Sequence, residues 1–151
     1  MAPFSSGHPT MSDHWSQKRN TSQAVKGYDP AFGYEMAAII ENGVKEMWGE
    51  DGDKDVIYYV TAYNENMPMP EKPEGVDEGI VKGLYKFSDA KPAQHKVRLI
   101  GSGAIMKQAL DAVELLAEYG VGAEIWSATS YSELQRDAVA SERADRLGAQ
   151  A

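Results

Sequence analysis

The sequence predicts an α/β protein built from partial parallel-sheet layers, and three observations support this class. Residues 56–63 are almost all β-branched or aromatic, and an unbroken apolar run of this kind indicates a central strand covered on both faces. Residues 97–126 follow the order strand, helix, strand, which predicts a crossover between two parallel strands. Between Phe32 and Met47, apolar residues recur at helical spacing, which predicts an amphipathic helix ahead of the first strand.

The composition indicates a globular protein and excludes several classes of function. Hydrophobic residues make up 42% of the 151 residues, and the formal net charge of −8 opposes binding to phosphate backbones, so we expect no nucleic-acid partner. Cysteine is absent, which excludes disulfides and thiolate metal sites and fits a reducing cytosol. No apolar run approaches the roughly 20 residues that cross a membrane. We therefore expect a cytoplasmic protein without a membrane partner.

Residues 1–27 mix Ser, Gly, Pro, His and Asn without a hydrophobic period, which predicts a flexible, disordered tail. His8 and His14 lie in this range. Histidine titrates near neutral pH, so either residue could act as a general base. Solvated side chains in a flexible segment are the interpretation that we favour.

The predicted first helix begins after Asp29, a residue type that accepts free backbone amides as an N-cap, and Pro30 suits the first helical position. On the outer face of the helix we expect four charged residues: Glu35, Glu41, Lys45 and Glu46. Beyond the helix, Asp51, Asp53 and Asp55 alternate as in a calcium loop. The rest of the twelve-residue calcium pattern is missing, so a solvated turn is the preferred interpretation.

Polar residues follow the first predicted strand at its carboxyl end, where ligands of open α/β sheets bind. Asn64, Glu65 and Asn66 could orient a substrate or hold a partner loop there, although a turn capped by the two amides is favoured. Three prolines at positions 68, 70 and 73 keep the next residues extended, and a short helix near residues 76–84 follows.

The second half of the chain carries a possible phosphate loop. Gly101 and Gly103 stand at a strand-to-helix turn, where helix amides attract anions. A dinucleotide fingerprint needs a third glycine at position 106, which holds Met106, so a tight turn is favoured. Ser130 and Glu133 have capping-box spacing and predict a further helix. His95, in a polar connector, is expected to be exposed.

The ordered motifs of the chain resemble the homodimeric type of pyruvate dehydrogenase E1 component, a thiamine diphosphate enzyme of the transketolase-like superfamily. The resemblance spans residues 28–147, and its motifs are Tyr28-Asp29-Pro30-Ala31-Phe32, Tyr58-Tyr59-Val60-Thr61, Asn64-Glu65-Asn66, Met69-Pro70, Pro73-Glu74-Gly75, Glu78-Gly79-Ile80, Gly83-Leu84-Tyr85-Lys86, Gly101-Ser102-Gly103, Arg136-Asp137 and Glu142-Arg143. The chain departs from the family pattern at Met67, Pro68, Ser141, Ala144 and Asp145. The resemblance implies the end of the middle domain over residues 28–88, a linker over 89–96 and the start of the C-terminal domain over 97–151.

For function, the resemblance implies decarboxylation of pyruvate on thiamine diphosphate with Mg²⁺, and acetyl transfer to the lipoyl group of the dihydrolipoyl acetyltransferase (E2) partner of a homodimeric enzyme. In the family, the cofactor-binding and catalytic groups lie upstream of the position of Tyr28. We therefore assign no catalytic, cofactor-binding or metal-binding residue here, and we expect the isolated chain to be inactive and to bind no cofactor. The alternatives are a non-catalytic α/β structural or interaction module and a nucleotide-binding protein that uses Gly101–Gly103.

Overall fold

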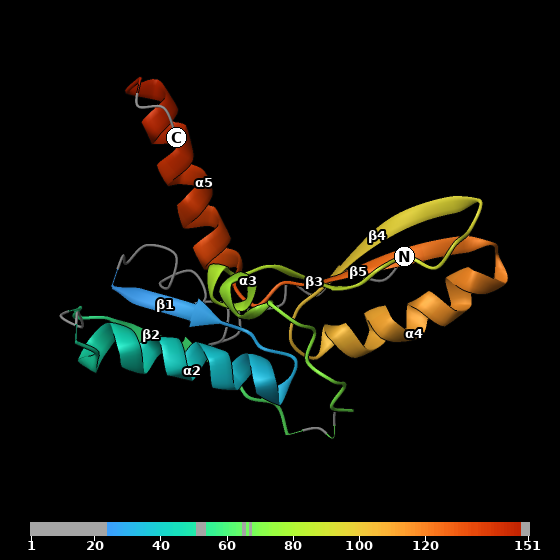
Figure 1. Cartoon of the computed structure of the whole chain (residues 1–151), viewed down its shortest axis with the longest axis horizontal. Helices are drawn as coiled ribbons and strands as arrows, with labels where there is room; N and C mark the ends of the chain where they lie inside the picture. The colour runs from blue at the N-terminus through green and yellow to red at the C-terminus, as the bar shows by residue number, and fades with distance from the viewer. Residues whose placement is uncertain (1–23, 51–53, 65, 67, 149–151) are drawn as a thin grey trace, which may run out of the picture.

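The computed structural model describes residues 24–50, 54–64, 66 and 68–148, and it confirms the α/β class. In chain order the elements are β1 (Val25–Tyr28), α2 (Gly33–Trp48), β2 (Ile57–Val60), α3 (Asp77–Lys82), β3 (Tyr85–Ser88), β4 (His95–Gly101), α4 (Ile105–Glu118), β5 (Val121–Ser127) and α5 (Tyr131–Arg146). The strands form two sheets, with α2 against the first and α4 against the second, while α5 projects away from the rest (Figure 1). We call residues 24–82 the first unit and residues 83–148 the second unit.

In the first unit, β1 and β2 are parallel and α2 connects them. The register runs from Val25 opposite Ile57 to Tyr28 opposite Val60. β1 begins inside the range 1–27 that composition predicted as a tail, because a four-residue strand that contains Gly27 is too short to show a period. His8 and His14 lie outside the described residues, so their interpretation remains a prediction.

The prediction that the first apolar run is a central, fully covered strand is wrong for this structure. Among the residues that the structure describes, β2 pairs only with β1. Ile57 is 63% exposed and Tyr59 42% exposed, whereas Tyr58 and Val60 pack on the core. Burial therefore alternates along β2, as expected for a strand with one covered face.

In the second unit the strand order is β3-β5-β4. β4 and β5 are parallel and α4 connects them, which confirms the predicted strand–helix–strand unit. β3 is antiparallel to β5, although it falls within the range 28–88 that the resemblance assigned to the first domain. The division between the two sheets therefore lies upstream of Tyr85, and the expected connector 89–96 is a loop within the second unit that ends as β4 begins at His95.

The hydrophobic core is continuous from one unit to the other. One buried cluster contains Tyr28, Ile39, Ile80 and Tyr85, and the other contains Phe32, Met106 and Ile125. Tyr34 and Phe87 pack against both clusters. Since each cluster contains residues from both units, the apolar packing holds the two sheets together.

Both predicted helix caps can be compared with the structure. Ser130 caps α5, because its Oγ accepts the Glu133 amide at 3.2 Å, as predicted. The Asp29 cap is wrong: the N-cap of α2 is Phe32, and the amides of Ala31 and Phe32 donate to the carboxylate of Glu35. None of the helices in the described part of the chain is long and apolar enough to cross a membrane.

Candidate functional site

Asp29, which does not cap α2, lies where the two units meet. Its Oδ1 accepts the hydroxyls of Thr61 and Tyr63, which follow β2, and its Oδ2 accepts Ser102 Oγ of the second unit at 2.9 Å. The Asp29 amide also donates to the carbonyl of Thr129 at 2.7 Å. One half-buried carboxylate thus connects the residues that follow β2 in the first sheet to the residue that follows β4 in the second.

The Gly101–Gly103 turn is packed against Asp29 and has no room for a phosphate. The Gly103 amide donates to the Asp29 carbonyl at 3.1 Å, and Gly103 has a φ of +49°. A Cβ at this position would lie 2.5 Å from Tyr63 Oη and 2.6 Å from Asp29 Oδ2. Because a carboxylate already occupies the space in front of the turn, the geometry supports the tight-turn interpretation and opposes anion binding.

A small pocket of about 300 Å³ opens at the carboxyl end of β2. Its wall combines the loop before α2, the residues after β2 and one residue of the second unit; they are Pro30, Ala31, Phe32, Gly33, Met36, Thr61, Ala62, Tyr63, Asn66, Met69 and Ala104. Asn66 therefore lines the pocket, while Asn64 is exposed and Glu65 lies outside the described residues. Burial and the hydrogen bond to Asp29 raise the pKa of Tyr63, which keeps its hydroxyl protonated as a donor. The pocket wall thus offers hydrogen-bond donors and acceptors, and among the described residues that line it the only ionisable group is this neutral phenol.

Glu35 is the second polar contact between the units, and the prediction that it faces outward is wrong. Its side chain is fully buried (0% exposed). Oε2 accepts the amides of Ala31 and Phe32 at 2.5 and 3.1 Å, and Oε1 accepts Tyr85 Oη and Ser127 Oγ at 2.7 and 2.6 Å. Burial and then the Glu35 charge raise the pKa of Tyr85 far above its ordinary value. The sequence signal that could have revealed this role is an acid in the first helical turn, where free amides need acceptors.

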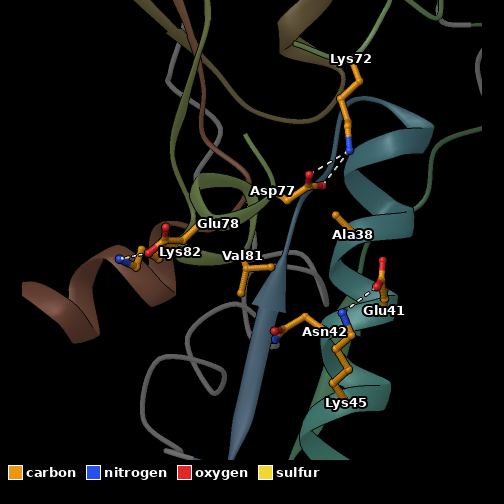
Figure 2. Close-up of a pocket in the computed structure, with 9 residues that line it drawn as sticks. All are labelled: Ala38, Glu41, Asn42, Lys45, Lys72, Asp77, Glu78, Val81 and Lys82. Atoms are coloured by element: carbon orange, nitrogen blue, oxygen red, sulfur yellow. Dashed lines mark hydrogen bonds and ion pairs between the residues drawn. The ribbon is translucent and has the colours of Figure 1, made fainter. Parts of the chain in front are cut away.

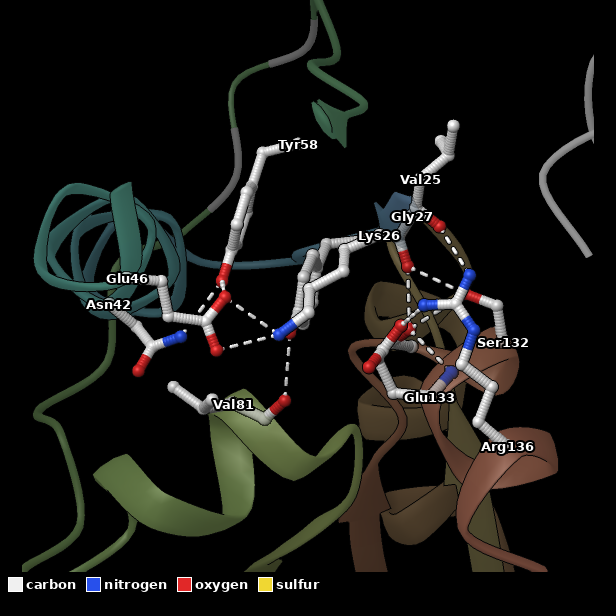
Figure 3. A network of polar contacts seen from close by, with 12 residues as sticks. Val25, Lys26, Gly27, Asn42, Glu46, Tyr58, Val81, Ser132, Glu133 and Arg136 are labelled. Carbon is white, nitrogen blue, oxygen red and sulfur yellow. Dashed lines mark hydrogen bonds and ion pairs between the residues drawn. The ribbon is translucent and has the colours of Figure 1, made fainter. Parts of the chain in front are cut away.

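A polar network holds α2 on the first sheet (Figure 3). Lys26 Nζ of β1 lies 2.7 Å from Glu46 Oε1 of α2, and Tyr58 Oη of β2 donates to Glu46 Oε2 at 2.8 Å. Asn42 Nδ2 donates to Tyr58 Oη at 2.9 Å. Burial raises the pKa of Glu46, but the hydrogen bonds from Lys26 and Tyr58 outweigh burial and lower it. Glu46 was also expected on the outside, so this network is a further correction.

The first turns of α5 are tied to β1, as the other half of Figure 3 shows. Ser132 Oγ donates to the Gly27 carbonyl at 3.1 Å, and Arg136 donates to the Val25 carbonyl at 2.5 Å. Glu133 pairs with Arg136. These contacts position the second unit against the first, and the backbone carbonyls that accept them are already part of a sheet.

The groove between α2 and α3 has a volume of about 510 Å³ and a wall of alternating charges (Figure 2). Its three lysines are all in ion pairs: Lys72 with Asp77 at 2.9 Å, Lys45 with Glu41 at 2.7 Å and Lys82 with Glu78 at 2.7 Å. Exposed pairs of this kind are well solvated and contribute little energy. The groove therefore presents a charge-balanced surface without a reactive group.

The remaining predicted site residues are not brought together. Asp55 is exposed, whereas Asp51 and Asp53 lie outside the described residues. His95 is exposed at the start of β4, as expected. Within the described ranges, no group of three or more His, Asp or Glu side chains is arranged to hold a metal ion.

Each half of the chain matches a domain of known proteins. Residues 6–70 match the pyruvate dehydrogenase E1 component middle domain, and residues 83–148 match the transketolase-like TK C-terminal domain. The pyruvate dehydrogenase E1 component of Escherichia coli is 46% identical over 121 residues, which are 80% of this chain and 14% of that protein. The Corynebacterium glutamicum protein is 43% identical over 136 residues, 89% of this chain and 15% of that protein.

Among solved structures, a transketolase variant from Pichia stipitis matches with a TM-score of 0.61 and 17% identity, over 80% of this chain and 16% of that one. At this identity the match concerns the fold, which is transketolase-like. The chain spans about 14% of the length of the Escherichia coli relative. The two domain matches follow each other along the chain, and the second begins just before β3, where the structure begins the second sheet. The chain is thus a relative of the pyruvate dehydrogenase E1 component, matching that protein where its middle domain is followed by its transketolase-like C-terminal domain.

Proposed function

We propose that this chain forms the joint between the middle and C-terminal domains of an enzyme of the pyruvate dehydrogenase E1 kind. Such an enzyme decarboxylates pyruvate on thiamine diphosphate and passes the acetyl group to the lipoyl group of its E2 acyltransferase partner. The identity of 43–46% to E1 components supports membership in such an enzyme. A cytoplasmic, homodimeric enzyme is part of the same proposal.

The observation that carries the proposal is the double attachment of Asp29. Its side chain accepts hydrogen bonds from residues after β2 and from Ser102, and its backbone bonds Gly103 and Thr129. Hydrogen bonds to a charged acceptor typically contribute about 1.5–3 kcal/mol each. Asp29 therefore fixes the angle between the two units, and the role that we propose is to set the geometry between two domains.

The described residues do not fit thiamine diphosphate and its Mg²⁺. A magnesium ion that bridges a diphosphate takes one or two carboxylates from the protein, so a fit requires a carboxylate beside the pocket with oxygen atoms available for the metal. Asp29 and Glu35, whose hydrogen-bond partners include residues of the pocket wall, already accept three and four hydrogen bonds, respectively. We therefore derive no catalytic step from this chain and propose that it supports chemistry performed by other segments of such an enzyme.

Three measurements on the purified 151-residue chain test this proposal. We expect no pyruvate-dependent reduction of an electron acceptor and no heat of binding on titration with thiamine diphosphate and Mg²⁺, with the Escherichia coli relative as the positive control. A measurable rate or saturable binding would contradict the assignment. We also expect both units to unfold together in urea, followed by the fluorescence of Trp48 of the first unit in a Trp15→Phe/Trp126→Phe variant and of Trp126 of the second unit in a Trp15→Phe/Trp48→Phe variant. Two separate unfolding midpoints would contradict the proposal that the chain forms a joint between two domains.

The second candidate is a stand-alone interaction module, and exposed apolar residues on both sheets favour it. Ile57 of β2 and Ile100 of β4 have more than half of their surface exposed. Exposed strands of this kind can pair with another chain. The coding sequence upstream of Met1 separates the two candidates: an open frame for a thiamine-binding domain supports the joint, whereas an in-frame stop codon directly upstream supports the module.

A further inference from the structure

The carboxylate of Glu35 divides its hydrogen bonds between the two units. Oε2 accepts the amides of Ala31 and Phe32 of the first unit, and Oε1 accepts the hydroxyls of Tyr85 and Ser127 of the second. We propose that Glu35 is a coupling residue through which the position of the second sheet fixes the shape of the pocket at the end of β2. This inference deepens the proposed joint and rests on it.

The loop that Oε2 holds is also a wall of that pocket. Pro30, Ala31, Phe32 and Gly33 all line it, and the two amides that Glu35 accepts belong to this loop. The pocket therefore depends on a carboxylate whose other oxygen is held by β3 and β5. A shift of the second sheet would move Oε1, and the rigid carboxyl group would carry Oε2 and the loop with it.

The chemistry of the contact makes this coupling strong. The Glu35 carboxylate is fully buried, and the partners that the structure gives it are two amides and two hydroxyls. The Tyr85 hydroxyl is itself 2.8 Å from Tyr34 Oη, so the contact extends to a second ring of α2. Because a buried charge must keep acceptor sites satisfied, loss of a donor on Oε1 forces the carboxylate to rearrange.

Hydrogen exchange of the Ala31 and Phe32 amides tests the inference. Ser127→Ala removes one donor from Oε1 without touching the pocket, and Tyr85→Phe removes the other. We expect exchange at both amides to become about tenfold faster or more in either variant, as follows from the loss of a hydrogen bond to a charged group. The Ile39 amide, in the middle of α2, serves as the internal reference for global unfolding.

Thr129→Val is the matched control. It removes a buried hydroxyl that donates to the Ile80 carbonyl at 2.6 Å, and it leaves Glu35 untouched. We expect the ratio of exchange at Ala31 to exchange at Ile39 to stay at the wild-type value. The inference is wrong if Ser127→Ala and Tyr85→Phe leave this ratio unchanged, or if Thr129→Val raises it equally. If the coupling fails this test but the chain still unfolds in one step, the proposed function as a joint between two domains still stands. Independent unfolding of the two units would instead contradict that proposed function.

Discussion

Replacement of Gly103 by alanine measures how much the contact with Asp29 contributes to stability. Gly103 has a φ of +49°, where an L side chain costs about 1–2 kcal/mol. The added Cβ would also stand 2.5 Å from Tyr63 Oη and 2.6 Å from Asp29 Oδ2, so the carboxylate must move. Displacement weakens hydrogen bonds to a charged acceptor, at about 1.5–3 kcal/mol for each one lost. We expect a total loss of roughly 3–5 kcal/mol in the free energy of unfolding.

Gly120→Ala is the matched control for this variant. Gly120 has a φ of +71°, and nothing lies within 4 Å of the position that its Cβ would take. Only the backbone strain of about 1–2 kcal/mol therefore applies. Urea unfolding followed by circular dichroism gives both values from the shift in midpoint at constant slope. Equal losses in the two variants would show that the close contact between Gly103 and Asp29 does not contribute to stability.

Three further predictions concern single side chains, each measured by urea unfolding. Lys26→Met should cost about 1–2 kcal/mol near neutral pH. Because the pKa of Glu46 is lowered on folding, its contribution is present above pH 4.5 and is lost as the pH falls through the lower folded value, so the difference from wild type should shrink in acid. Burial raises the pKa of Tyr34 to about 12. Its contribution to the free energy of unfolding is therefore complete below pH 10 and is lost between pH 10 and about 12. In the Tyr34→Phe variant, the free energy of unfolding should fall less steeply over that pH range. Ser130→Ala removes both the cap of α5 and the 2.5 Å bond to the Gly27 carbonyl, and should cost about 1–3 kcal/mol; a loss below 0.5 kcal/mol would contradict the capping role.

Local patterns in the sequence predicted several elements well. The apolar period from Phe32 to Met47 corresponds to α2, and Ser130 caps α5 as its spacing with Glu133 predicted. Both signals act within a few residues along one element, so they need no knowledge of the rest of the fold. The glycine turn before α4 was likewise predicted as a tight turn, because Met106 stands where a dinucleotide fingerprint needs glycine.

Features that depend on distant contacts could not be predicted in the same way. In the sequence, Glu35 cannot be told from a surface acid of an amphipathic helix. It is buried because Tyr85 and Ser127, which are 50 and 92 residues away along the chain, donate hydrogen bonds to it in the fold. Asp29 has the sequence context of a helix N-cap, yet its carboxylate accepts a hydrogen bond from Ser102 of the second unit instead. Both errors arise where the two units meet, because periodicity describes one element and says nothing of what packs on it.

The position of β3 in the second sheet determines whether the fragments share a sheet after the chain is cleaved. A protease that cleaves the exposed loop near Lys91 would leave β3 on one piece and β5 on the other, although the two strands are hydrogen-bonded in one sheet. The nicked halves should stay associated in solution, and separately expressed halves divided there should reassemble. Scission in the proline-containing stretch near Glu71 would instead leave each sheet whole on its own piece.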